Sequence, residues 1–153
     1  MLQPVTLLKT IRQNILTLIQ DLSVDQLNQV PSGFNNNMIW NAGHVLVTQQ
    51  LLYYKLSRLT PHVPEEMIDR YRRGTKPEGK VPQDEINYIR QHLAETANRA
   101  ERDVAQGIFR DFQPYVATTF GVELTRLEDA IAFNNLHEML HCGYMMAQKR
   151  LVA

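Results

Sequence analysis

The sequence predicts an all-α protein built as a four-helix bundle. Apolar residues recur at steps of three and four in four long segments, and no segment shows the alternation of a strand. At least two of the connections between these segments are long, which suits a bundle of packed helices. Because 153 residues is the length of one domain, we expect a single domain over residues 1–153.

The first helix is expected from about Val5 to Leu22, where leucines and isoleucines follow the helical period. Ser23 and Gln26 then have the spacing of a capping box, in which each side chain satisfies a free backbone N–H group of the other residue. A short turn of helix should therefore begin at this point and end at the Pro-Ser-Gly sequence 31–33.

The second long helix is expected to start after the asparagines at 35–37, any of which can cap it, and to run to about Leu59. Pro61 and Pro64 should end it. The stretch 60–81 contains three prolines and two glycines, so we expect a long connection with one helical turn around residues 65–72.

The third and fourth helices complete the bundle. Pro82 is placed to start the third helix, whose apolar stripe extends to Ile108. Thr125 and Glu128 have the spacing of a second capping box, and the last helix should run from there to about Leu151.

Composition and charge narrow the function. Sixteen basic residues balance sixteen acidic ones, so there is no electrostatic reason to expect nucleic acid or an anionic membrane as a partner. The single cysteine, Cys142, cannot form an intramolecular disulfide, which favours a reducing compartment. The N-terminal residues lack the pattern of a secretion signal, and no apolar run approaches the roughly 20 residues that span a bilayer. We therefore expect a soluble cytoplasmic protein.

The last helix carries an anomaly on its expected buried face. This face is apolar at first, polar for two turns, and then partly apolar again: Leu127, Ile131, Asn134, His137, Glu138, His141, Met145 and Gln148. Burying an unpaired polar group costs about 1–3 kcal/mol, so something in the core should satisfy these groups. His137 and His141 are four residues apart and can reach one metal ion; two unrelated histidines are the alternative.

The sequence His137-Glu138-Met139-Leu140-His141 also matches the H-E-x-x-H motif of zinc proteases, where the glutamate is the general base. The third histidine of the metzincins is absent, which argues against that class. A di-iron bundle needs Glu-x-x-His on two helices, and this chain has one copy.

His44 is the best placed third ligand, because it lies near the start of the second helix. Gly43 beside it costs about 0.5–1 kcal/mol in a helix, which suggests close approach by another backbone or by a ligand; Gly143 poses the same question. His62 lies in the proline-rich connection and His92 lies beside the apolar stripe of its helix, so neither is expected to bind metal.

Other polar residues have two interpretations each. Glu138 is either a general base or a salt-bridged residue that steadies a ligand. Asn41, Asn134, Tyr144 and Gln148 either line a pocket or hydrogen-bond in the core. Trp40, Cys142 and the methionines at 139, 145 and 146 are expected to be core residues.

Two motifs resemble one family. Trp-Asn-x-Gly-His at 40–44 and His-Glu-x-x-His followed by Gly-Tyr at 137–144 are similar to the DinB-like superfamily of damage-inducible bacterial proteins, also called DinB/YfiT-like metalloproteins. The resemblance implies a four-helix bundle, often a homodimer, with a divalent metal on His44, His137 and His141. It also implies a relation to transferases and isomerases that use low-molecular-weight thiols.

Three imidazoles leave a coordination position open, as in catalytic zinc sites. Zinc or nickel is the expected ion, and iron, copper and manganese remain open. We expect a metal-dependent enzyme acting on a small molecule, either a thiol S-transferase or a hydrolase. The alternative is a non-catalytic, stress-related bundle that binds a metal or a ligand.

Overall fold

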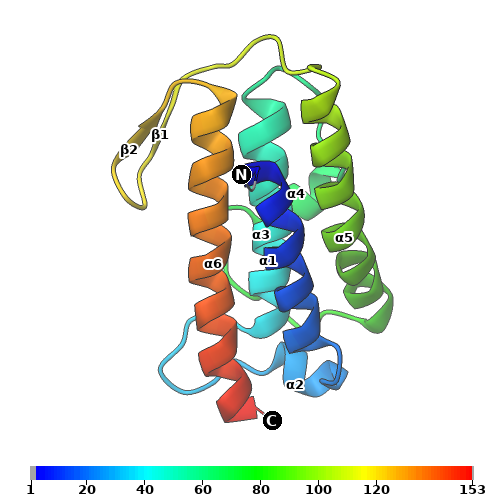
Figure 1. Cartoon of the computed structure of the whole chain (residues 1–153). Helices are drawn as coiled ribbons and strands as arrows, with labels where there is room; N and C mark the ends of the chain where they lie inside the picture. Colours follow the sequence, from blue (N-terminus) through cyan, green and yellow to red (C-terminus); the bar gives the residue numbers. More distant parts are fainter. Residues whose placement is uncertain (1–2, 153) are drawn as a thin grey trace.

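The computed structural model describes residues 3–152, so residues 1–2 and 153 of the expected domain lie outside the described residues. The protein is mainly α-helical, as the sequence predicts, and four long helices lie side by side (Figure 1). They are α1 (Pro4–Ile19), α3 (Met38–Gln50), α5 (Gln83–Ala105) and α6 (Leu127–Val152). Shorter elements are α2 (Val24–Asn28), a π-helical segment (Leu51–Lys55), α4 (Glu65–Tyr71), β1 (Tyr115–Ala117) and β2 (Val122–Leu124).

The start of the chain follows the sequence pattern closely. Pro4 occupies the first turn of α1, where its missing N–H group has no cost, and α1 ends three residues before the expected Leu22. The capping box before α2 is confirmed. The Ser23 N–H group donates to Gln26 Oε1 (2.9 Å), and the Gln26 N–H group donates to Ser23 Oγ (3.2 Å).

The second long helix changes its winding before it ends. Asn37 caps α3 by accepting a hydrogen bond from the Trp40 N–H group (2.9 Å). From Leu51 the chain winds as a π-helix, and the Leu56 N–H group donates to the Leu51 carbonyl five residues back (3.1 Å). The expected α-helix to Leu59 is therefore too long. Apolar residues in this stretch suit either winding, so the sequence pattern does not distinguish them.

The connection between α3 and α5 supports α3 through the short helix α4, which confirms the helical turn expected around residues 65–72. The buried ring of Tyr71 lies directly on Gly43. A Cβ atom at Gly43 would lie 2.5–2.7 Å from three atoms of that ring. The glycine thus admits an aromatic side chain, not a ligand or a backbone. Gly143 faces open space among the described residues.

A β-hairpin between α5 and α6 departs from the expectation of no strands. β1 and β2 pair antiparallel, with Tyr115 opposite Leu124 (Figure 1). Each strand has only three residues, which is too short to show an alternating pattern in the sequence. In the described range α5 also ends earlier than expected, and Ile108 is exposed.

The second expected capping box, between Thr125 and Glu128, is wrong. The side chain that Thr125 contacts is that of Asp129, one residue further along the chain. The backbone N–H group and the hydroxyl of Thr125 both donate to Asp129 Oδ2, each at 2.9 Å. Because α6 begins at Leu127, Asp129 and not Glu128 stands in the third helical position.

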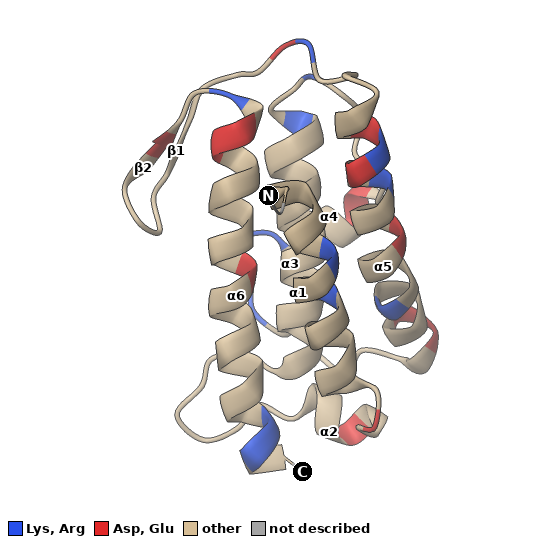
Figure 2. Ribbon diagram, viewed as in Figure 1, with Lys and Arg blue, Asp and Glu red and all other residues tan. Residues whose placement is uncertain are grey.

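The apolar core is divided into two clusters. One surrounds Trp40 and the C-terminal part of α1, and the other surrounds Tyr53 and the N-terminal part of α1. Charged residues are frequent on α5 and at both ends of α6 (Figure 2). Within residues 3–152, no helix is both long enough and apolar enough to cross a membrane.

The two glycines give a first testable prediction. Gly43→Ala should lower the free energy of unfolding by about 1–3 kcal/mol, because the buried Tyr71 ring must move away. Gly143→Ala is the matched control, and it should raise the free energy of unfolding by about 0.5–1 kcal/mol, since alanine favours the helix and meets no atom there. Urea unfolding followed by circular dichroism measures both. Equal effects of the two substitutions would contradict the packing role of Gly43.

Candidate metal centre

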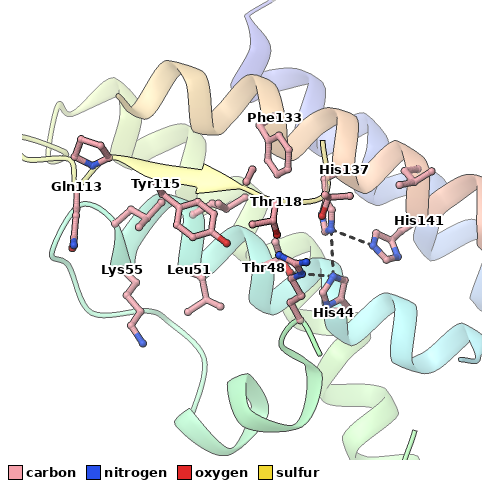
Figure 3. Close-up of a pocket in the computed structure, with 17 residues that line it drawn as sticks. His44, Thr48, Leu51, Lys55, Gln113, Tyr115, Thr118, Phe133, His137 and His141 are labelled. Carbon is pink, nitrogen blue, oxygen red and sulfur yellow. Dashed lines mark hydrogen bonds between the residues drawn. The ribbon is translucent and has the colours of Figure 1, made fainter. Parts of the chain in front are cut away.

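Three imidazole rings meet where α3 faces α6 (Figure 3). His44 comes from α3, and His137 and His141 lie one turn apart on α6. His137 Nε2 lies 3.3 Å from His44 Nε2 and 3.2 Å from His141 Nε2. The potential ligand atoms of all three residues lie within 4.8 Å of one another. The structure therefore brings together the three histidines that the sequence pattern singles out.

The spacing of these nitrogens suits a four-coordinate ion. Nitrogen ligands at 2.0–2.1 Å from zinc with tetrahedral angles lie about 3.3–3.4 Å apart, close to the two contacts observed here. No fourth His, Cys, Asp or Glu residue joins the cluster in the part of the chain that the structure describes. The three histidines could hold a metal ion and leave one coordination position to another molecule.

The orientation of His44 is set by its neighbours on two sides. His44 Nδ1 donates to the Tyr71 carbonyl at the end of α4 (2.7 Å). The Trp40 ring stacks on the His44 ring with centroids 4.7 Å apart, and Trp40 Nε1 donates to the Thr75 hydroxyl (3.1 Å). With its proton on Nδ1, His44 presents the Nε2 lone pair to the centre. Trp40 is buried, as expected, and in addition positions this ring.

The orientation of His141 is set by a chain of amides. His141 Nδ1 donates to Asn41 Oδ1 (2.7 Å), and Asn41 Nδ2 donates to Gln148 Oε1 (3.1 Å). Gln148 Nε2 in turn donates to the Asn36 carbonyl (3.0 Å). Of the two interpretations of Asn41 and Gln148, the structure supports hydrogen bonding in the core. Like His44, His141 presents its Nε2 lone pair to the centre.

His137 cannot satisfy both of its neighbours without a further atom. Its Nε2 lies between two nitrogens that each present a lone pair, and a single N–H group can donate to only one of them. Its Nδ1 is buried and has no hydrogen-bond partner among residues 3–152. A cation at the centre would accept all three lone pairs at once, so the polar atoms present fit a bound metal ion.

Burial keeps the three rings neutral. Burial, with a smaller contribution from the neighbouring histidines, lowers the pKa of His137 to about 3 and the pKa of His141 to about 2. Burial also lowers the pKa of His44, against the opposing effect of its hydrogen bond to Tyr71. Neutral imidazole is the form that binds metal, so the site is prepared for a cation at physiological pH.

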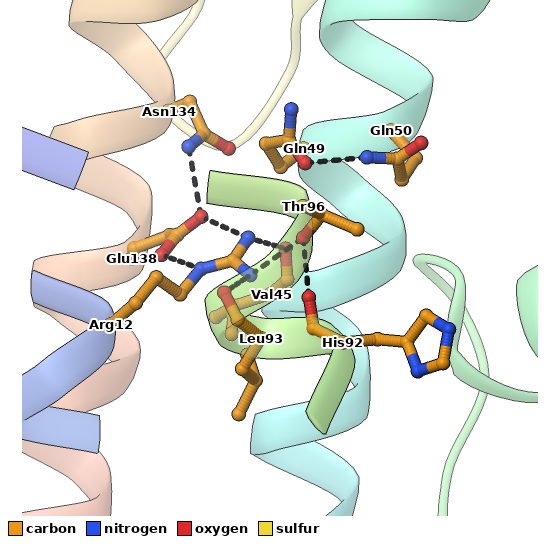
Figure 4. Close-up of polar contacts among 9 residues, drawn as sticks. All are labelled: Arg12, Val45, Gln49, Gln50, His92, Leu93, Thr96, Asn134 and Glu138. Carbon is orange, nitrogen blue, oxygen red and sulfur yellow. Dashed lines mark hydrogen bonds and ion pairs between the residues drawn. The ribbon is translucent and has the colours of Figure 1, made fainter. Parts of the chain in front are cut away.

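Glu138 lies in the protein interior, where its carboxylate faces the guanidinium group of Arg12 (Figure 4). Arg12 Nε donates to Glu138 Oε2 (2.6 Å), and Arg12 Nη2 donates to Glu138 Oε1 (2.8 Å). Asn134 Nδ2 donates to the same Oε1 atom (2.9 Å), and Glu138 is fully buried. This arrangement favours the salt-bridged role that the sequence pattern leaves open for Glu138, and Asn134 belongs to the same network.

Arg12 is the functional residue that the sequence pattern did not single out. Besides Glu138 on α6, it donates to the Leu93 carbonyl on α5 (3.2 Å) and to the Val45 carbonyl on α3 (3.2 Å), so it links all four long helices. Its spacing from the apolar residues of α1 could have revealed that it is buried. Arg12 lies four residues after Leu8 and three before Ile15, on the buried stripe of α1.

A pocket of about 460 Å³ adjoins the three histidines (Figure 3). The π-helical segment, the β-hairpin and α6 supply its walls, which are lined by Leu51, Leu52, Leu56, Tyr115, Phe133 and Leu140 among others. Thr48 lies at its inner end, and its hydroxyl is 3.5 Å from His44 Nε2. The pocket connects the open side of the site to the surface.

The remaining candidates lie outside this pocket. Tyr144 is about half exposed, and Cys142 is buried in the core as expected. Met145 is buried, whereas Met139 and Met146 are exposed, which corrects their assignment to the core. His62 and His92 are partly buried and line a separate polar cleft against α5, apart from the three histidines.

The lowered pKa values predict how the metal-free protein responds to acid. Below pH 6.5 the histidines of the unfolded chain take up protons, whereas His137 and His141 in the folded protein do not until about pH 3. The free energy of unfolding should therefore fall between pH 7 and pH 5, by up to about 1.4 kcal/mol per pH unit for each histidine. Urea unfolding across this range measures the slope, and carboxylates contribute little there.

His44→Gln is the control for this measurement, because it removes one of the titrating groups. Its unfolding free energy should depend less steeply on pH than that of the wild type. The same slope in both proteins would show that His44 keeps its ordinary pKa.

The buried ion pair gives another prediction. Arg12→Leu and Glu138→Leu should each lower the free energy of unfolding by about 3–5 kcal/mol, because each leaves an unpaired buried charge. The double variant should regain most of this loss, since no unpaired charge remains. A double variant as unstable as the sum of the single changes would contradict the pairing.

Comparison with known proteins supports these observations. No curated protein matches the sequence. A family model, that of the DinB superfamily, matches residues 7–145, a range that includes Arg12, all three histidines and Glu138. Since this match covers most of the 153 residues, the chain belongs to the DinB superfamily.

Proposed function

We propose that the protein is a metal-dependent enzyme that acts on a small molecule, with His44, His137 and His141 as the metal ligands. The observation that carries this proposal is the open side of the three-histidine cluster, which faces a pocket of about 460 Å³. A structural metal site is normally closed by a fourth protein ligand, whereas a catalytic site keeps a position for water or substrate.

The ligand set favours zinc or nickel, and imidazole nitrogens also suit copper and iron. Such an ion, when bound, lowers the pKa of a thiol or of a water molecule at its open position. This chemistry suits transfer of a small thiol to an electrophile, or hydrolysis. Thiol transfer is the reaction we favour, because it is what the resemblance to thiol-dependent enzymes implies.

The protein's own residues then hold and orient the metal ligands and the substrate. Tyr71 and Asn41 fix the rings of His44 and His141, and the leucines and Phe133 of the pocket exclude water from the substrate. Thr48 can hydrogen-bond a group bound beside His44. Glu138 supports the site through its ion pair with Arg12, which connects α6 to α3. We assign Glu138 no direct proton transfer.

The second candidate function is a non-catalytic protein that binds a metal or a ligand under stress. It shares the three histidines and differs in what the pocket does. A sequestering protein needs tight metal binding and no turnover, whereas the proposed enzyme must also accept a thiol and an electrophile.

The enzyme proposal is tested by reacting zinc- or nickel-loaded protein with small thiols and a chromogenic electrophile such as 1-chloro-2,4-dinitrobenzene. Thiol consumption above the uncatalysed rate is expected for the wild type, and loss of this activity is expected for His137→Gln. Glu138→Gln is the control for Glu138 and should keep most of the activity, because the amide oxygen can still accept a hydrogen bond from Arg12 and no proton transfer is assigned to this residue. Its complete inactivity with metal retained would restore Glu138 as general base. No activity of the wild type on a broad set of thiols and esters would favour the binding protein.

We further propose that the four long helices form a bundle of the DinB type and that the protein is a homodimer through α6. Apolar and small side chains are exposed along this helix, and Glu138, the one Asp, Glu, Lys or Arg residue between Asp129 and Lys149, is buried. Figure 2 shows it as a single red band in the middle of α6. The exposed apolar residues are Leu136, Met139, Leu140, Tyr144, Met146 and Leu151. A two-fold dimer pairs the same surface of both copies, so an uncharged face brings no like charges together.

The ends of α6 support an antiparallel arrangement of two copies. Its first turn is acidic and its last turn is basic, so each end of one helix would lie beside the oppositely charged end of the other. Light scattering coupled to size-exclusion chromatography should give twice the mass of one chain for the wild type and a single chain for Leu136→Glu. A monomeric wild type would contradict the dimer and leave the metal site unaffected.

A further inference from the structure

The pocket beside the three histidines has an unusual balance of charge. Of the 17 residues that line it, Lys55 and Arg73 are basic and none is acidic. In the described range 3–152, neither side chain makes an ion pair or a side-chain hydrogen bond. The polar cleft that His62 and His92 line, by contrast, contains Glu95 next to its basic residues. The pocket therefore offers two unneutralised cations to whatever it binds.

The π-helical segment places one of these cations in the pocket. It contributes Leu51, Leu52 and Lys55 to the wall, while Tyr53 and Tyr54 between them are buried in the core. Lys55 and the histidines lie at opposite ends of the pocket in Figure 3. Lys55 lies eleven positions after His44, or roughly 16 Å along a helix, so the pocket is elongated.

Arg73 enters the pocket from the connection that follows α4. It comes two residues after Tyr71, whose carbonyl holds His44. The same short segment therefore orients a candidate metal ligand and presents a guanidinium group to the pocket. Guanidinium groups bind carboxylates through paired hydrogen bonds.

Between Lys55 and the histidines the walls are largely apolar. Leucines from the π-helical segment and Leu140 and Phe133 from α6 form this part. An apolar surface of this kind gains free energy by covering an apolar portion of a ligand.

We propose that the pocket selects an elongated organic anion, which lays its apolar body against the leucines and Phe133 and places its carboxylate on Lys55, while Arg73 adds positive charge to the same pocket. This inference rests on the proposed function in one respect: the opposite end of the substrate reaches the metal. The substrate class would then be a thiol that carries a carboxylate.

The test uses two matched pairs of ligands, titrated into zinc-loaded protein by isothermal calorimetry. One pair is 8-mercaptooctanoate and 8-mercaptooctan-1-ol, and the other is octanoate and octan-1-ol. In each pair we expect the carboxylate to bind about five- to tenfold more tightly than the alcohol. Lys55→Gln and Arg73→Gln should each reduce this preference. Lys76→Gln removes an exposed charge outside the pocket, is the matched control, and should leave the preference unchanged.

The two pairs separate this inference from the proposed function. Thiols that bind no better than their thiol-free counterparts, with the carboxylate preference intact, would contradict thiol chemistry and support the anion pocket. Equal binding of carboxylate and alcohol in both pairs would overturn the anion pocket, as would a preference that survives both substitutions or the absence of any binding.

Discussion

The arrangement of this protein depends on one buried ion pair, between Arg12 of α1 and Glu138 of α6. Both side chains are almost completely shielded from solvent, and both carboxylate oxygens accept hydrogen bonds from the guanidinium group (Figure 4). The remaining guanidinium N–H groups reach carbonyls of α3 and α5. A misplaced helix would leave a charge or a carbonyl unpaired in the core, so this network restricts how the helices can slide past one another.

The same network positions the three histidines. Val45 directly follows His44, and Glu138 directly follows His137, so contacts of Arg12 fix α3 and α6 at the height of the metal centre. Neighbouring residues on a helix point about 100° apart, which lets α6 present Glu138 to the core and His137 to the pocket. The polar stretch of α6 therefore serves two purposes on two faces. A buried ion pair adds little net stability, and its value here lies in the specific arrangement that it imposes.

The parts of this structure that could be predicted from the sequence are those that depend on residues close together in the chain. The helical period, the Ser23–Gln26 capping box and the spacing of His137 and His141 are all set within a few residues. His44 could be found because it lies near the start of its helix, within one turn of Trp40, whose ring stacks on it, and beside Gly43. Arg12 could not be matched to Glu138 in this way, since 126 residues separate them and only the folded structure brings them together. The π-helical segment and the hairpin were missed because their backbone geometry, and not their apolar pattern, distinguishes them.

Tyr71 illustrates a second limit of prediction from the sequence, because it lies in a segment without a strong apolar pattern. The sequence pattern indicated that Gly43 admits a close neighbour, yet the neighbour is an aromatic ring from a connection expected to be mainly a loop. That connection also supplies the carbonyl that orients His44 and, through Arg73, a cation of the pocket. A segment with no strong periodicity thus contributes as much to the site as the helices do.

The most direct test of this account is the metal content of the protein, purified without a histidine tag and treated with zinc or nickel, for the wild type and for His44→Ala. Elemental analysis should find about one ion per chain in the wild type and a large loss in the variant, because His44 supplies the only ligand from α3. Circular dichroism would confirm that the variant is folded. A folded wild type that binds no metal, or equal metal content in both proteins, would contradict the proposal that the three buried imidazoles form a metal centre.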